Sequence, residues 1–275
     1  MKKITGENIR RLANSRRLHS DSSKKNIIVN NDSLVNDSGD NIFLPIHNST
    51  ERNEIQKWER ISGRDTVFIS FVSDPPGSTF YSDRIGNIIG SLDRLGYDYC
   101  IVHYDNDRNY YQNCCFKPSY IGKKIKEYNK NILWIDGDTT LKNGMDHFIG
   151  SPDNFDIGLV TYTGNIDGII ASPIFFKNTE NSLELINEWA DHCKNKIENG
   201  ICELDHDALK HVILPNLRNR IRIKLNWDNN NSLHRGEILE NVNSDVPNKR
   251  KILDEMSIIN RSRPFSYNNQ DFILI

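Results

Sequence analysis

The sequence predicts an α/β protein, built as a single domain around a mostly parallel central sheet with flanking helices. Strand-like and helix-like segments alternate between residues 66 and 135, which is the pattern of strands joined by crossover helices. The strand-like segments are nearly continuous apolar runs, as expected for strands that are covered on both faces. The chain has 275 residues, of which 37% are hydrophobic, so it is long enough for a domain with a substantial core.

The first half of the predicted domain contains three strands and two helices. We expect strands at 66–72, 97–104 and 131–135 and helices at 81–96 and 119–129. The segment TVFISFV at 66–72 combines β-branched and aromatic residues, which favour strands. In the helix at 81–96 the apolar residues recur at helical spacing, and Gly96 is a typical helix stop.

The second half follows the same alternation less regularly. We expect strands at 155–162, 168–176 and 220–226 and helices at 182–200 and 205–217. The helix at 182–200 has the clearest apolar stripe, which includes Leu185, Trp189 and Cys193. Beyond residue 236 the chain is polar, and a further helix is expected within 249–259.

Polar segments flank this domain on both sides. Residues 1–62 form an N-terminal tail that we expect to be poorly structured, because few of its residues can enter a core. A short helix is expected at 50–61, where Ile55, Trp58 and Ile61 would share one face. The predicted domain itself spans 63–240, and residues 241–275 form a C-terminal extension.

Charge and composition exclude several classes of protein. The formal net charge of −2 gives no overall basic field of the kind that binds nucleic acid. No apolar stretch approaches the length of a transmembrane helix, and the basic N-terminus lacks the apolar core of a secretory signal. The five cysteines form no Cys-x-x-Cys pair, which favours a reducing compartment. These observations together predict a cytoplasmic protein.

Two carboxylates stand at the end of the predicted strand 131–135, in the stretch NILWIDGDTTL. Asp136 and Asp138 would repel one another there unless a cation lies between them. Mn²⁺ or Mg²⁺ suits such oxygen ligands, and the metal can then bind a diphosphate and neutralise charge on a leaving group. The alternative is a structural turn in which the aspartates bond to nearby backbone.

The bare Asp-x-Asp pattern is not specific, because it occurs three times in this chain. The copies begin at Asp105, Asp136 and Asp205. The copy at 205 sits at a predicted helix start, where acids often only complement the helix dipole. The copy at 105 follows an apolar strand but precedes a polar loop. The copy at 136 has the stronger apolar run before it, so we favour it as the functional pair.

With these segments in order, the chain resembles the GT-A glycosyltransferases, the nucleotide-diphospho-sugar transferases of the Asp-x-Asp type. Five stretches carry the resemblance: FISFVSD (68–74), NCCFKPSYI (113–121), NILWIDGDTTL (131–141), the region from FDIGLVTYTG to LELINEW (155–189), and DHDALKHVI (205–213). The likeness covers about residues 64–235 and is closest to small bacterial or viral members. It implies a single GT-A (Rossmann-like) domain.

The resemblance also implies roles for individual residues. Asp138 would bind the metal directly, and Asp136 would bind it through water or hold the donor ribose. Ser73 and Asp74 would touch the nucleotide, and Lys117 the diphosphate. The remaining two implied roles belong to His234, as a third metal ligand, and to Asp205, as the base or orienting group at the acceptor hydroxyl.

The function implied is transfer of a sugar from a nucleoside-diphosphate sugar, with a UDP-sugar as the expected donor, to an acceptor hydroxyl. His206 stands where the family more often has Gln, which puts the acceptor pocket in question more than the donor site. Asp205 alternatively serves only as a helix cap, and His234 and Lys117 as ordinary polar residues.

Three other functions remain open at this stage. The stretch DGDTT fits the opening motif of haloacid-dehalogenase-type phosphatases, with Asp136 as nucleophile and Asp138 as acid and base. That motif normally lies on the first strand of its domain, whereas two strand–helix units precede it here. A sugar nucleotidyltransferase would need a glycine-rich phosphate loop, for which the region 73–84 offers one glycine. A non-catalytic module that binds a sugar nucleotide is the third.

Overall fold

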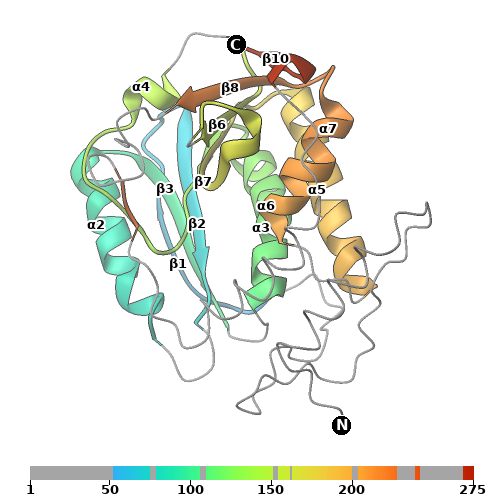
Figure 1. The fold of residues 1–275 in the computed structure, drawn as a ribbon. Coiled ribbons are helices and arrows are strands. Elements are labelled where there is room, and N and C mark those ends of the chain that lie inside the picture. Colours follow the sequence, from blue (N-terminus) through green and yellow to red (C-terminus); the bar gives the residue numbers. More distant parts are fainter. Residues whose placement is uncertain are drawn as a thin grey trace.

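A mixed sheet forms the centre of the structure, a computed structural model that describes residues 52–74, 79–105, 110–150, 154–161, 163–199, 204–227, 239–241 and 269–275 (Figure 1). Within these residues the sheet has eight strands in the order β1-β3-β2-β4-β7-β6-β8-β10. Its strands are β1 (Glu54–Arg60), β2 (Thr66–Val72), β3 (Asp98–Tyr104), β4 (Asn131–Trp134), β6 (Ile157–Thr161), β7 (Ile169–Phe176), β8 (Arg222–Trp227) and β10 (Ile273–Leu274).

Most of these strands run in the same direction. Strand β2 pairs in parallel with β3 and β4, and β8 pairs in parallel with β6 and β10. Strand β7 is antiparallel to both β4 and β6, and β1 is antiparallel to β3. Six of the eight described strands are therefore co-directional, which confirms the predicted α/β class with a mostly parallel sheet.

Helices cover both faces of this sheet. The helical elements are η1 (Ser82–Arg84), α2 (Ile85–Leu95), α3 (Tyr110–Tyr128), α4 (Asp146–Ile149), η2 (Ile166–Gly168), α5 (Glu180–Glu198), α6 (Asp205–Ala208), the π-helical turn η3 (Leu209–Ile213), α7 (Leu214–Leu217) and η4 (Asn269–Asp271). Helix α2 lies on one face, and α3 and α5 to α7 lie on the other (Figure 1). Because successive strand residues point to opposite faces, β2 serves both cores: Ile69 packs with the α3 and α5 cluster and Phe68 with the α2 cluster.

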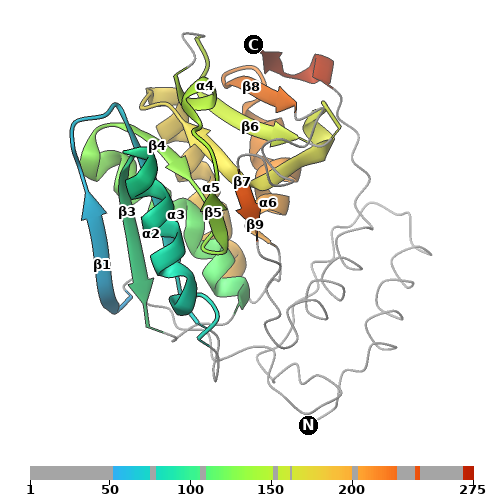
Figure 2. The ribbon, with the colours of Figure 1, turned by 90° about the vertical axis from the view of Figure 1, so that its left-hand side faces the viewer.

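A second, two-stranded sheet joins distant parts of the chain. It pairs β5 (Thr139–Leu141), which directly follows Asp138, with β9 (Leu239–Asn241) in an antiparallel register (Figure 2).

The short helix predicted at 50–61 is wrong. Residues Glu54–Arg60 form the edge strand β1, which pairs with β3 (Figure 2). The apolar spacing that suggested a helix face does not mark a buried face, because Ile55 and Ile61 are 57% and 42% exposed. Strands β1 and β10 lie outside the interval 63–240, yet both pair with strands inside it.

Helix α3 also differs from its expected bounds. It begins at Tyr110, before the predicted start at 119, and contains Pro118 in its interior. The predicted helix at 205–217 corresponds to the consecutive segments α6, η3 and α7. The tail up to residue 51 and the helix expected within 249–259 lie outside the described residues. In the described part of the chain, no helix combines the length and apolar character that crossing a bilayer requires.

Candidate active site

A cavity of about 340 Å³ opens at the carboxyl ends of β2 and β4. The chain passes from β2 to β3 on one side and then returns to β4 on the other side, so the strand order reverses at this point. Ligands of open α/β sheets bind in the crevice formed by such a reversal. The lining residues are Phe71, Val72, Ser73, Tyr81, Asn113, Cys114, Lys117, Trp134, Asp136, Gly137, Asp138, Leu204, Asp205 and His206.

Asp136 is held by its neighbours and faces this cavity. Its Oδ1 accepts a hydrogen bond of 2.8 Å from the Trp134 indole, and its backbone N–H donates to the Ser172 hydroxyl at 2.9 Å. The turn after β4 is closed by backbone, because the Thr139 N–H donates to the Asp136 carbonyl at 3.0 Å. Within the described residues the turn is thus closed by the backbone rather than by the Asp136 carboxylate, and 38% of the Asp136 side chain remains exposed.

Gly137 is required by packing. A Cβ atom at this position would lie 2.7 Å from Cγ1 of Val72 and 3.2 Å from the Phe71 carbonyl. The turn that carries both aspartates therefore rests directly on β2, and a side chain at 137 would push it away from the sheet.

Lys117 reaches the same cavity from α3 and bridges two carboxylates. Its Nζ lies 2.8 Å from Oδ2 of Asp205 and 3.5 Å from Oδ1 of Asp136, and only 7% of its side chain is exposed. Burial lowers the pKa of this ammonium group, but the two carboxylates outweigh burial and raise it well above its usual value. Lys117 is thus a fixed positive charge between Asp136 and Asp205.

Asp205 is buried at the first turn of α6. The Trp189 indole donates to its backbone carbonyl at 2.8 Å. Leu204 precedes the helix, and no side chain caps the helix at that position. The Asp205 carboxylate instead forms the ion pair with Lys117. The cap interpretation of Asp205 is therefore wrong.

The charges that line the cavity leave an excess of negative charge. Three carboxylates (Asp136, Asp138 and Asp205) and the ammonium group of Lys117 give a formal charge of −2, with His206 counted as neutral. One divalent cation would balance this charge, and the oxygen donors of Asp136 and Asp138 suit Mn²⁺ or Mg²⁺. Among the described residues no group of three or more potential metal ligands occurs, and His234 lies outside them.

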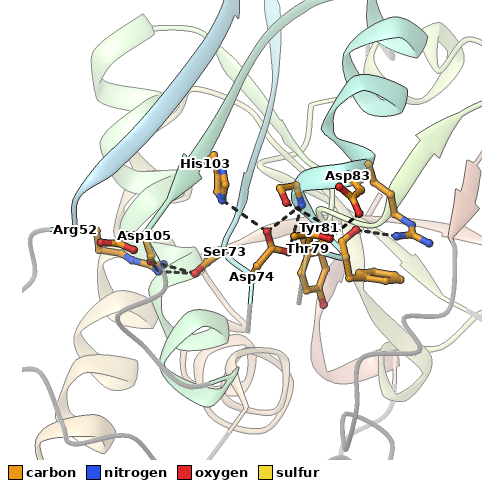
Figure 3. A network of polar contacts seen from close by, with 11 residues as sticks. Arg52, Ser73, Asp74, Thr79, Tyr81, Asp83, His103 and Asp105 are labelled. Carbon is orange, nitrogen blue, oxygen red and sulfur yellow. Dashed lines mark hydrogen bonds and ion pairs between the residues drawn. The ribbon is translucent and has the colours of Figure 1, made fainter. Parts of the chain in front are cut away.

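Ser73 and Asp74 follow β2 and differ in their surroundings (Figure 3). Ser73 lines the cavity, and its hydroxyl donates to the Asp105 carbonyl at 3.2 Å and accepts from the Arg52 guanidinium at 3.1 Å. Asp74 lies outside the lining. Its carboxylate accepts the backbone N–H of Tyr81 at 2.7 Å and lies 3.8 Å from the His103 imidazole.

The contacts of Asp74 shape the wall of the cavity, because they fix the backbone of Tyr81, a lining residue (Figure 3). Whether Asp74 touches a nucleotide, as the resemblance implies, stays a prediction. The competing pair at 105 is only half described: Asp105 is exposed and Asp107 lies outside the described residues.

The sequence did not single out Trp134, Ser172, Tyr81 or Asn113. Trp134 was foreseeable, since residues two apart in an extended segment point to the same side, which places its indole beside the Asp136 carboxylate. Ser172 was not, because its position opposite Asp136 depends on the antiparallel register of β4 and β7.

Comparisons with known proteins give only distant likenesses. No protein-family model matches the sequence, and no curated protein matches it. One similar solved structure is a glycosyltransferase involved in the glycosylation of the major capsid of PBCV-1, with 13% identity and a TM-score of 0.45 over 60% of this chain and 82% of that chain. Another is the apo structure of the WbbM bifunctional glycosyltransferase, with 14% identity and a TM-score of 0.34 over 50% of this chain and 38% of that chain. Likenesses at this level establish neither a family nor an activity.

Proposed function

We propose that the protein is a metal-dependent glycosyltransferase that moves a sugar from a nucleoside-diphosphate sugar to an acceptor hydroxyl. One observation carries this proposal: at the strand-order reversal, a cavity brings the Asp136–Asp138 turn together with the buried Lys117–Asp205 pair. This arrangement offers oxygen ligands for a cation on one wall and a polar helix start on another.

Asp136 and Asp138 would hold the cation, with His234 as the proposed third ligand. The cation would bind the diphosphate and stabilise the charge that develops on the leaving group. The Trp134 indole keeps the Asp136 carboxylate oriented toward the cavity. Ser73 and the Tyr81 wall, which Asp74 supports, would lie beside the nucleotide of a UDP-sugar.

The surroundings of Lys117 favour a positioning role over direct contact with the diphosphate. Its ammonium group is buried and already paired with Asp205 and Asp136. A group in this position sets the distance between the two carboxylates, and so links the metal side of the cavity to α6.

One observation favours the phosphatase alternative. A lysine lies 3.5 Å from Asp136, and a phosphoryl-transfer nucleophile benefits from such a cation. We rank this function second because β4 is preceded along the chain by β2 and β3 of the same sheet, rather than opening the domain. A non-catalytic sugar-nucleotide module would share the binding properties and lack turnover.

A thermal-shift experiment tests the donor site. We expect UDP with Mn²⁺ to raise the melting temperature, as ligand at 100 times its Kd stabilises by about 2.7 kcal/mol. Asp138→Asn should abolish this shift and leave the melting temperature of the free protein nearly unchanged. Asp191→Asn, at an exposed position of α5, is the matched control and should behave as wild type.

The alternatives give different results. GDP, CMP and dTDP in the same screen identify the base if UDP is not the donor nucleotide. A shift with Mg²⁺ and beryllium fluoride, lost in Asp136→Asn, together with no nucleotide effect, would replace the proposal with the phosphatase. Nucleotide binding without release of UDP from any UDP-sugar would indicate the non-catalytic module.

A further inference from the structure

A chain of contacts joins the Asp136–Asp138 turn to His206 through Lys117 and Asp205. His206 lines the cavity, and 39% of its side chain is exposed. Its Nε2 lies 3.5 Å from Oδ1 of Asp207, and its Nδ1 lies 3.9 Å from Oδ1 of Asp205. The imidazole is therefore accessible to a substrate and is flanked by two carboxylates.

Asp205 is poorly placed to accept a proton during a reaction. It is 2% exposed, and its Oδ2 forms the 2.8 Å ion pair with Lys117. If Asp205 were protonated, the buried ammonium group would lose the shorter of its two carboxylate contacts. Breaking a buried ion pair on one side is costly, so the carboxylate is better suited to holding Lys117 than to changing charge.

We propose that His206, rather than Asp205, removes the proton from the acceptor hydroxyl; this inference rests on the proposed glycosyl transfer. The acceptor O–H gives its proton to a ring nitrogen of His206, and the acceptor oxygen bonds to the anomeric carbon. The bond from that carbon to the diphosphate oxygen breaks, and its electron pair leaves with the nucleoside diphosphate. Direct displacement of this kind inverts the configuration at the anomeric carbon.

The charges around His206 suit this role. On α6 it faces Asp205 and Asp207, whose carboxylates stabilise the imidazolium that forms. From α3 the cavity also receives Lys117 and Cys114, and from the turn after β4 it receives Asp136 and Asp138. Helix α5 contributes the Trp189 indole, which contacts the Asp205 carbonyl. The ammonium group of Lys117 disfavours a second positive charge on His206, but the two carboxylates in contact with Lys117 offset this repulsion.

The acceptor hydroxyl has a single proton, so it can donate to the ring nitrogen of His206 or to Oδ1 of Asp205, which lies 3.9 Å from Nδ1, but not to both. The Asp205 carboxylate is already paired with Lys117. Histidine is the side chain best suited to proton transfer near neutral pH, so the proton goes to His206.

The test measures UDP release from a panel of UDP-sugars with Mn²⁺ and simple sugar acceptors, as a function of pH. His206→Gln should lower kcat by about 10²- to 10⁴-fold and remove the acidic limb of the pH profile. The UDP and Mn²⁺ thermal shift should stay unchanged. His147→Gln, at an exposed position of α4, is the matched control and should keep the wild-type profile.

Asp207→Asn provides a second variant that keeps the imidazole. It should lower kcat less than His206→Gln and keep the acidic limb, because the group that accepts the proton is still present. If His206 had only a structural role, His206→Gln would keep the limb as well. An NMR measurement on the product should show the inverted anomer.

The inference is overturned if His206→Gln keeps the acidic limb with kcat within about threefold of wild type, or if the product retains its configuration. If the acidic limb is lost in Asp205→Asn but kept in His206→Gln, Asp205 is the residue that accepts the proton. If wild-type protein neither binds UDP with Mn²⁺ nor releases UDP, the proposed function itself fails. Wild-type turnover with an unaffected His206 variant refutes only the inference.

Discussion

Replacing Lys117 with methionine tests the central charge arrangement of the site. Met keeps most of the aliphatic stem but removes the ammonium group that lies between Asp205 and Asp136. The Asp205 carboxylate, whose side chain is 3% exposed, would then be buried without its partner. Loss of one member of a buried pair costs about 3–5 kcal/mol, and in a domain of this size the melting temperature should fall by on the order of 10 °C.

Urea denaturation of five proteins isolates this effect: the wild type, Lys117→Met, Asp205→Asn, Lys117→Met/Asp205→Asn and Lys124→Met. Lys117→Met should show the full loss, and Lys117→Met/Asp205→Asn should recover about 2 kcal/mol or more, because the second change removes the orphaned charge. Lys124→Met is the matched control on the same helix. That lysine is equally buried, but its partner Glu127 is 36% exposed, so the loss should be about 1 kcal/mol or less.

Two results would refute the reasoning. One is a loss below about 1 kcal/mol for Lys117→Met, which would mean that the ammonium group contributes no more than a surface ion pair. The other is full additivity of the two changes, which would mean that Lys117 and Asp205 do not interact in solution.

Three further outcomes follow from other contacts. Burial raises the pKa of Asp156, but hydrogen bonds, led by the one from Arg222, lower it from 3.8 to about 2. The contribution of Asp156 to the free energy of unfolding, about 2 kcal/mol, should therefore be lost as pH falls from about 4 to 2. Urea titrations of Asp156→Asn should show a flatter loss over this range. Gly137→Ala should cost about 1–3 kcal/mol through the contact with Val72, and adding Val72→Ala should cost less than the sum of the single changes; additivity would exclude the contact. Mn²⁺ should change the tryptophan fluorescence, and Trp134→Phe should remove most of that change; an equal change in both proteins would place the metal elsewhere.

Strands and helices whose burial shows in the local sequence pattern were predictable. The segment at 66–72 is uniformly apolar and forms β2, in which every residue is buried. The residues at 85–95 repeat at helical spacing and form α2, which ends at Gly96 in the left-handed conformation. In both segments the local pattern and the tertiary environment agree.

Edge and kinked elements were not predictable in the same way. Strand β1 is exposed or half-buried along its length, so the spacing of its apolar residues does not mark a buried face, and its conformation is fixed by pairing with β3. The start of α3 was missed because Pro118 is normally a helix boundary, whereas here it lies inside the helix.

The site was predictable only in its contiguous part. Asp136 and Asp138 stand out because they follow an apolar strand. The ion pair of Lys117 with Asp205 joins residues 88 positions apart in the sequence, and no local pattern indicates that they meet. The role of His206 beside this pair depends on the same long-range packing.

The pairing of β5 with β9 has a consequence for when the site is complete. Thr139 pairs with Asn241, which lies 102 residues further along the chain. Closing so long a loop is slow, and synthesis proceeds from the N-terminus, so this pairing forms after the parallel strands β2, β3 and β4 have assembled. A nascent chain that ends before residue 239 already contains every described residue of the cavity, but the strand next to Asp138 still lacks its partner. Full order of the Asp136–Asp138 turn therefore arrives late in biogenesis, and a ligand that binds this turn would favour chains that have reached that stage.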